Sequence, residues 1–254
     1  MWSSSRLAPG VKDPLGCNIK QVEEPGVKLL GAPIGSPEFI AQFIKKRVAK
    51  IKAITEQLPS LCQPHLEFVL LRSCLALPKI SYLLRTTDTS RSKPLLQEFD
   101  SLTREALSRI LGGPSSDETW AQAKLPISMG GLGLRAAKDH AAAAFSISYL
   151  SSQPLVYALL KQEVPDQVLL PASVLHVVTS KVGAEEPITS EFFHNVTQKM
   201  LSAKIDLNNQ QLLLEQLKRV CWDFVGTLLG LLLDFFGTLL GHFGTSFGTS
   251  LGLL

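Results

Sequence analysis

A long amphipathic helix near the N-terminus is the sequence feature that most constrains the fold. Ser36 can cap its free amides, Pro37 suits the first helical position, and the Glu38 carboxylate favours the positive end of the helix dipole. Pro59 ends the pattern. Between these limits, apolar residues recur at helical spacing, at Phe39, Ile40, Phe43, Ile44, Val48, Ile51 and Ile54. We expect this apolar face to pack on the next helices along the chain.

Helical patterns follow one another along most of the sequence. Pro78 removes a backbone donor from the middle of one of them and should kink or split it. Gly112-Gly113-Pro114 is a strong stop signal, and Asn208-Asn209 is expected to break the last helix. The expected helices span about 64–85, 93–111, 116–120, 136–151, 154–163, 168–182 and 189–221.

These patterns predict an all-α fold. We expect an irregular helical bundle with at most one short N-terminal strand or hairpin and with disordered or non-globular termini. Val27–Ile34 can form one short strand, but a lone strand has nothing to pair with. The predicted organisation is a disordered lead over 1–26, a helical domain over 27–151, accessory helices over 152–223 and a low-complexity tail over 224–254.

The tail from Phe224 repeats a Phe-Gly-Thr theme that favours neither helix nor strand. Three interpretations are open. Its apolar length passes the crude test for a membrane segment, and it could also bind a partner protein. The third interpretation is a tandem nucleotide repeat translated in shifting frames, which explains the related fragments Trp222-Asp223-Phe224 and Phe236–Phe243.

Positive charge is concentrated in one half of the chain. Residues 28–138 carry 16 Lys and Arg against 9 Asp and Glu, a net charge of +7, whereas the whole chain has +3. Five basic residues crowd the polar side of the first helix, namely Lys45, Lys46, Arg47, Lys50 and Lys52. This pattern suggests a polyanionic partner such as nucleic acid, although an ordinary solvated helix face explains it equally well.

The cysteines and histidines predict neither a disulfide framework nor a metal site. Four cysteines are scattered along the chain, and Cys62-Gln-Pro-His65 is a pair at ligand spacing without a second pair to complete four ligands. We expect reduced, mostly buried thiols, an intracellular protein in the nucleus or the cytoplasm, and no cofactor. The N-terminus lacks the apolar core of a signal peptide.

The sequence also lacks the residues that nucleotidyl transfer needs. Two-metal catalysis requires paired carboxylates, and no Asp-Asp pair is present. Gly130-Gly131-Leu132-Gly133 precedes a helix without the spacing or strand of a phosphate-binding loop. Asp139-His140 has no nucleophile in register and is expected to be a pair on a helix surface. We therefore expect no enzyme activity from this chain.

Two segments, in this order and spacing, resemble part of a known family. They are VKLLGAPIG at 27–35 and LPISMGGLGLR at 125–135, which leads into an alanine-rich helix. Together they resemble the C-terminal part of non-LTR retrotransposon reverse transcriptases, over about 22–155. The resemblance implies a primer-grip-like strand at Leu30, Gly31 and Ala32, then a helical thumb, then a connector. The connector residues would be Gly130, Gly131, Gly133 and Arg135.

Two functions are open from the sequence. The first is a catalytically incomplete fragment of an RNA-directed DNA polymerase whose thumb-like helices bind a primer–template duplex. The resemblance then implies that the missing fingers and palm of a parent polymerase are partners. The alternative is a non-enzymatic helical interaction protein, with a hydrophobic tail for which membrane association stays open.

Overall fold

The computed structural model describes residues 25–161, 170–184 and 196–220, with positions 188, 192, 193, 223 and 227. The described chain is mainly helical, as the sequence predicts, and has one two-stranded hairpin near its start. Its strands and α-helices are β1 (Gly26–Leu29), β2 (Ala32–Gly35), α1 (Pro37–Thr55), α2 (Pro64–Leu70), α3 (Leu77–Thr86), α4 (Lys93–Ile110), α5 (Asp117–Lys124), α6 (Ala137–Leu160) and α7 (Ala172–Val182). Residues 198–220 are also helical.

The expected lone strand is an antiparallel hairpin. β1 pairs with β2 so that Gly26 faces Gly35 and Leu29 faces Ala32. Of the two predicted possibilities, a single strand or a hairpin, the hairpin is confirmed. The expectation that the strand has nothing to pair with is wrong, because its partner lies in the residues that directly follow it. Leu30 and Gly31 form the turn with positive φ angles of 48° and 92°, the backbone that two-residue hairpins favour. A leucine at such a position is uncommon, and so the sequence disguises the turn.

Helix α1 begins as predicted. The Ser36 hydroxyl accepts a hydrogen bond from the Phe39 N–H at 3.2 Å, and Pro37 occupies the first turn. Ile44, Val48 and Ile51 are almost fully buried. The apolar spacing of the sequence therefore gives the face that packs inward.

The second predicted helix is split, but its break lies ahead of Pro78. α2 continues into a π-helical turn over Leu71–Leu75, and Ala76 then leaves helical geometry before α3 begins. Pro78 lies in the first turn of α3. Its missing N–H costs nothing there, because first-turn amides lack helical partners.

Two other helix predictions are wrong. α6 runs through Pro154 without interruption, although a separate helix was expected from residue 154. Residues 198–220 are helical through Asn208-Asn209, where a break was expected, and the helix begins later than residue 189. Pro154 therefore has helix on both sides, although proline removes a backbone donor from the middle of a helix.

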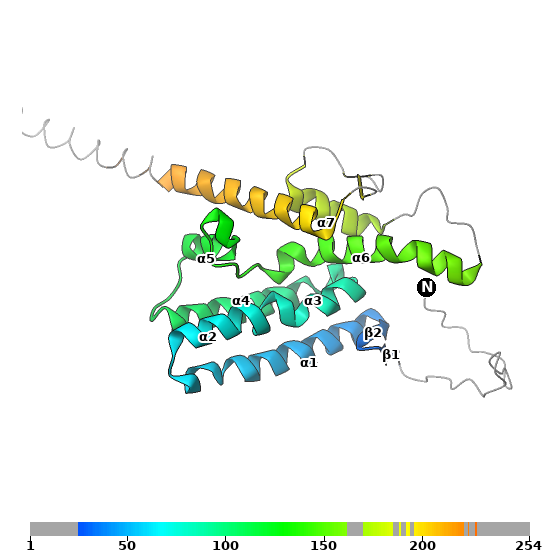
Figure 1. Ribbon diagram of the computed structural model, residues 1–254, viewed down its shortest axis with the longest axis horizontal. Helices are drawn as coiled ribbons and strands as arrows, with labels where there is room; N and C mark the ends of the chain where they lie inside the picture. The colour runs from blue at the N-terminus through cyan, green and yellow to red at the C-terminus, as the bar shows by residue number, and fades with distance from the viewer. Residues whose placement is uncertain are drawn as a thin grey trace, which may run out of the picture. The chain divides into compact units, whose positions relative to one another are not determined.

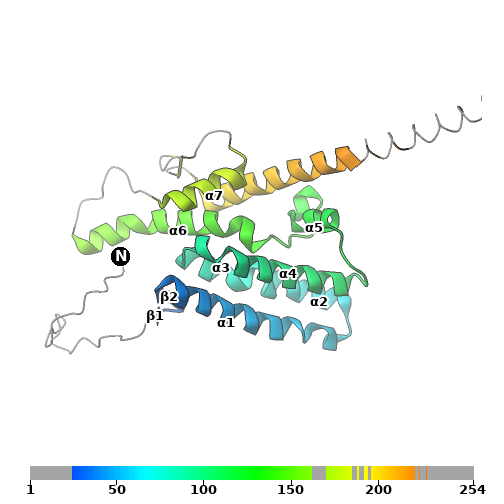
Figure 2. The same ribbon diagram turned by 180° about the vertical axis from the view of Figure 1, so that it is seen from behind.

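The helices up to Asn209 are arranged in layers (Figures 1 and 2). In both views α1 lies on one side of α3 and α4, and α6 lies on their other side. α7 packs beyond α6. One buried cluster joins α1, α3, α4 and α6. Its members are Ile44, Val48, Ile51, Ile80, Leu83, Leu84, Leu96, Phe99, Ala137, Ala141 and Ala144.

The far side of α6 has its own apolar cluster. Ala143 of α6 packs there with Val174 and Val178 of α7 and with Leu201 and Ile205 of the following helix. α6 therefore presents apolar surface to both sides, and alanines at positions such as 141, 143 and 144 let its neighbours approach closely.

The described residues fall into two compact units, one ending at Asn209 and one beginning at Gln210. The predicted domain limits stay predictions, and α6 runs across the expected change at 151–152. The 1–26 lead and the 224–254 tail lie almost wholly outside the described residues. Among the described helices, none combines the length and the apolar character that crossing a bilayer needs.

Candidate nucleic-acid interface

The five basic residues predicted for nucleic-acid contact all lie between the middle of α1 and its last turn, and all are exposed. They are Lys45, Lys46, Arg47, Lys50 and Lys52. The buried side chains of the same helix, Ile44, Val48 and Ile51, alternate with them at helical spacing. We call these five residues the basic face of α1. It forms because charged side chains fill the positions that the core leaves to solvent.

Helical geometry divides this basic face into two rows. At 100° per residue, Lys46 and Lys50 stand one turn apart, opposite the buried side, with Arg47 beside them. Lys45 and Lys52 lie about two turns apart on the other flank. Small exposed alanines lie between the rows, so a polyanion could approach the helix closely.

Nearby carboxylates compensate little of this charge. Lys52 pairs with Glu56 across 4.0 Å, and both side chains are more than half exposed. Among the described residues, no ion pair involves the other four cations of the basic face. An exposed pair of this kind contributes about 0.5 kcal/mol or less, and the face keeps its positive potential.

The primer-grip-like residues lie in the hairpin beside the start of α1 (Figure 1). Leu30 is 88% exposed at the turn, whereas Ala32 is buried in β2. The Tyr82 hydroxyl of α3 donates a hydrogen bond to the Leu30 carbonyl at 2.7 Å. This hydrogen bond fixes the turn against the helical layer while its leucine side chain faces solvent.

The connector residues form a tight loop that folds back on α5. The N–H groups of Gly133 and Leu134 donate to the carbonyls of Leu125 and Ala123, which α5 leaves free at its end. Gly130 and Gly133 have φ angles of 76° and 74°. A Cβ at Gly131 would overlap the backbone carbonyl of Leu125. Glycine at these positions follows from backbone geometry, and phosphate binding is not needed to explain it.

Arg135, at the end of the connector, belongs to a buried charged group. Its Nη2 donates to Asp206 Oδ2 at 2.5 Å, and His140 Nε2 lies 3.5 Å from Asp206 Oδ1. Asp206 is 2% exposed and His140 is 5% exposed. The connector arginine therefore ties the start of α6 to the helix that carries Asp206.

Asp139 forms a second buried pair at the start of α6. Lys181 Nζ of α7 donates to its Oδ1 at 2.5 Å, and Lys124 Nζ lies 3.6 Å from its Oδ2. Burial alone would raise the pKa of Asp139. The hydrogen bond and charge of Lys181, with the charges of Lys124 and Lys138, outweigh burial and hold the pKa below its usual value.

Asp100 of α4 supplies the cap that α6 lacks in its own sequence. Its two carboxylate oxygens accept hydrogen bonds from the Ala137 and Lys138 N–H groups at 2.7 and 3.1 Å. Burial raises the pKa of Asp100 from 3.8 to about 6, because it outweighs the two backbone hydrogen bonds. We call Asp100, Asp139, Asp206 and their partners the α6 charge network.

Sequence reasoning missed this network. The prediction that Asp139-His140 lies on a helix surface is wrong, since both side chains are buried. The run of alanines after His140 is the available signal, because it marks a helix surrounded by close neighbours. Asp100 and Asp206 carry no comparable signal, since their partners lie 37 and 71 residues away in the sequence.

The predicted site residues do not form one cluster. Lys45, Lys46, Arg47, Lys50 and Lys52 share one helix, and the hairpin adjoins the beginning of that helix. The connector instead packs against α5, with Arg72 beside Gly133.

The described part of the chain contains no group of three or more His, Cys, Asp or Glu side chains that could hold a metal ion. Cys62 and Cys74 are free and exposed, so the expectation of buried thiols is wrong for these two. Cys62 adopts a left-handed backbone at the end of a short 3₁₀ turn, where its side chain faces solvent.

Comparisons with known proteins give one partial similarity. No known family profile matches the chain, and no solved structure matches it. Over 60 residues it is 38% identical to the Retrotransposable element SLACS 132 kDa protein of Trypanosoma brucei gambiense. That stretch is 24% of this chain and spans 5% of the relative's length. The sequence therefore indicates a relation to a retrotransposon protein over part of the chain.

Proposed function

We propose that this chain derives from the reverse transcriptase of a retrotransposon, and that it binds a primer–template duplex through the basic face of α1 without polymerising nucleotides. The observation that carries the proposal is the exposure of all five cations on one helix whose opposite side is buried. The partial similarity to a retrotransposon protein supports the proposed origin.

The two rows of cations suit contact with phosphates. A lysine or arginine that meets a phosphate releases condensed counterions, so its contribution depends on salt and ignores base sequence. A protein that holds a growing duplex needs this behaviour, because the sequence beneath it changes with each addition. The basic face offers positive charge in two rows, which suits contacts to phosphates more than hydrogen bonds to the edges of bases.

The hairpin is the proposed second point of contact with the duplex. Its exposed turn at Leu30 and Gly31 is fixed to α3 by Tyr82, and it adjoins the start of α1. From Gly35 to Lys45 the rise along the helix is about 15 Å, so the hairpin and the basic face could touch one strand at separate places. In this proposal, Leu30 and Gly31 touch the backbone near one end of the bound stretch, while the buried Ala32 supports the turn from beneath.

Catalysis would need groups that this sequence does not supply. Nucleotidyl transfer uses two metal ions held by paired carboxylates, and the sequence has no Asp-Asp pair. The buried carboxylates of the α6 charge network already bind lysine, arginine or backbone N–H groups. We therefore propose that polymerisation requires the fingers and palm of a parent polymerase as partners.

The proposal is tested by removing three charges from α1. The variant Lys46→Ala, Arg47→Ala, Lys50→Ala should weaken binding to an RNA–DNA hybrid by roughly tenfold to a hundredfold at physiological salt, measured by fluorescence anisotropy. Loss of affinity should be the same for hybrids of unrelated sequence. Alanine preserves helix propensity, so the variant should fold.

A matched control removes the same charge elsewhere. Lys79, Lys199 and Lys218 are exposed helical residues outside α1, and their joint replacement by alanine should leave most of the affinity. Equal losses in both triple variants would overturn the assignment to α1. Template-dependent nucleotide incorporation by a clean preparation of the chain would overturn the catalytic part.

A further inference from the structure

A cleft lies between α4, α6 and α7, separate from the basic face of α1. Its volume is about 300 Å³, at the lower end of the range for small-molecule sites. The turn before α4 closes one end of it with Asp88, Thr89 and Ser90. The cleft therefore has walls from separate parts of the chain, and the buried core of the fold holds those parts together.

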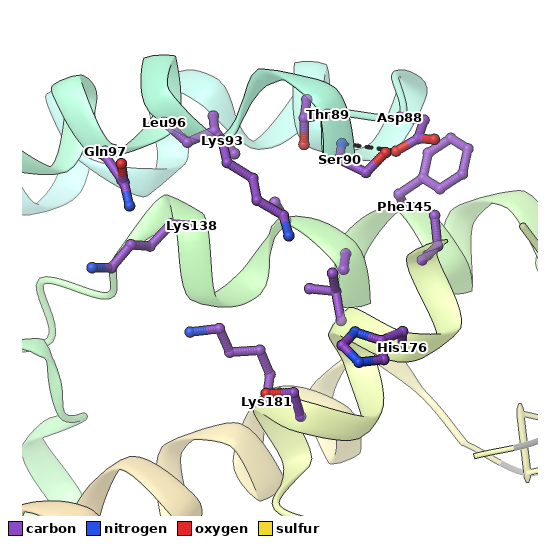
Figure 3. Close-up of a pocket in the computed structure, with 15 residues that line it drawn as sticks. Asp88, Thr89, Ser90, Lys93, Leu96, Gln97, Lys138, Phe145, His176 and Lys181 are labelled. Carbon is purple, nitrogen blue, oxygen red and sulfur yellow. Dashed lines mark hydrogen bonds between the residues drawn. The ribbon is translucent and has the colours of Figure 1, made fainter. Parts of the chain in front are cut away.

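Three lysines from three helices line this cleft. Lys93 of α4 and Lys181 of α7 extend into the space between those helices, in front of α6, and Lys138 of α6 lies at its rim (Figure 3). Asp139 already binds Lys181. Among the described residues, no ion pair involves Lys93 or Lys138.

Few groups in the cleft offset this charge. Asp88 is the acidic residue that lines it, and its carboxylate accepts the Ser90 N–H at 2.9 Å. Lys138 lies near the buried carboxylates of Asp100 and Asp139, whose negative charges partly compensate its positive charge. Lys93 is therefore the lysine with the least compensation in this set, and its ammonium group extends inward.

The other side of the cleft is largely apolar. Phe145 of α6 and Val177 of α7 line it and are half-buried. Figure 3 shows Phe145 near Asp88 at one end and the exposed imidazole of His176 on α7 at the other. Cations on one side and an apolar wall with aromatic side chains on the other suit a ligand with an anionic group and a flat apolar part.

We propose that this cleft binds a nucleotide phosphate, with the phosphate between Lys93 and Lys181, Lys138 adding its charge at the rim, and the base against Phe145 and Val177. The nucleotide is either free or the terminal unit of a nucleic-acid strand. The phosphate accepts charge-assisted hydrogen bonds from the ammonium groups, and the apolar wall takes the face of the base out of water.

The test uses the full chain and adenosine monophosphate, with binding measured by isothermal titration calorimetry. Saturable binding is expected, and Lys93→Gln should weaken it roughly tenfold or more, since hydrogen bonds to charged groups are the strong ones. Lys79→Gln, an exposed lysine of α3 outside the cleft, should leave binding unchanged. Adenosine should bind far more weakly, and inorganic phosphate should compete.

Three results would overturn the proposal: absence of saturable binding, equal binding of adenosine and its monophosphate, or equal effects of the two glutamine variants. A 5′-phosphorylated oligonucleotide that competes better than its unphosphorylated twin would identify the strand end as the source of the ligand. Equal competition by the two would identify the free nucleotide. Lys93→Gln should leave duplex binding by α1 intact, so this proposal can fail while the duplex proposal stands.

Discussion

The basic face of α1 and the α6 charge network use similar side chains in opposite environments. On α1 the cations are exposed, and among the described residues the one ion pair that they form is the weak pair of Lys52 with Glu56. Around the start of α6, carboxylates that are at most 6% exposed meet lysine, arginine and backbone N–H groups at hydrogen-bond distance. The cations of the first set are free to meet a ligand, whereas the carboxylates of the second are already bound within the protein.

This contrast separates charges that serve binding from charges that serve the fold. Removing an exposed cation costs little stability, because water already solvates that cation in the folded protein. Removing one partner of a buried pair leaves the other charge without compensation in a poorly solvated place. Substitutions in the two regions should therefore differ in what they change, with the largest effects on stability among the buried charges and the smallest on α1.

The largest loss of stability is expected at Asp206. Asp206→Ala should lower the free energy of unfolding by about 3 kcal/mol, because it leaves Arg135 and His140 without their buried partner. Urea denaturation measures this. Asp117→Ala is the matched control, since Asp117 pairs with Arg104 at 2.7 Å but is 88% exposed, and its loss should cost less than about 1 kcal/mol. Equal losses at both positions would remove the distinction between the regions.

The connector should tolerate little change at Gly131. Gly131→Ala places a Cβ against the Leu125 carbonyl and should cost about 2 kcal/mol. Gly113→Ala adds the same atom where nothing lies within 4 Å, and the free energy of unfolding should change by less than about 0.5 kcal/mol. Thermal or urea unfolding of the two variants compares them directly. A neutral Gly131→Ala variant would contradict the close approach of this loop to α5.

Asp100 should make the protein more stable as pH falls from 7 to 5. Its folded pKa, about 6, is raised above the usual 3.8, so the folded state binds the proton more tightly than the unfolded state. The stability gained on protonation is fully present below about pH 4 and is lost as pH rises through 6. Between pH 7 and pH 5 the gain should be about 1 kcal/mol.

Asp100→Asn removes this contribution and serves as the comparison. The change in unfolding free energy between pH 7 and pH 5 should be smaller by about 1 kcal/mol in this variant than in the parent protein. Asp139 should not interfere, because the stability that its lowered pKa contributes is present above the usual carboxyl pKa of 3.8 and is lost only as pH falls through and below that value. The same pH dependence in both proteins would contradict the raised pKa.

The smallest effect on stability is expected on α1. Replacing Lys46, Arg47 and Lys50 by alanine should change the free energy of unfolding by less than about 0.5 kcal/mol, because these side chains are exposed and alanine favours helix. Circular dichroism during urea titration measures the change. A loss comparable to that of Asp206→Ala would show that the basic face belongs to the fold.

The sequence predicted the parts of the fold that local chemistry determines. Ser36 caps the helix that it precedes, by accepting the N–H group of Phe39, as predicted. The exposed positions of the basic face follow from the spacing of Ile44, Val48 and Ile51. In each case the signal lies within a few residues of its consequence.

The features that depend on distant residues were not predicted. The cap of α6 comes from Asp100, 37 residues before the amide that it binds. The cleft lysines Lys93, Lys138 and Lys181 come together through the packing of three helices. The sequence allowed a hairpin near the start of the chain, but the position of its turn was not predicted, because Leu30 adopts a backbone conformation that is rare for leucine.

The central claim is that the basic face of α1 binds phosphates, and the salt dependence of duplex binding tests it most directly. The slope of log affinity against log salt should be negative for the parent protein on a DNA duplex. In the Lys46, Arg47 and Lys50 triple alanine variant, the slope should become shallower by about 0.9 for each phosphate that the variant no longer neutralises. The Lys79, Lys199 and Lys218 triple variant should keep the parent slope. No salt-dependent binding by the parent protein, or the same slope in all three proteins, would contradict the claim.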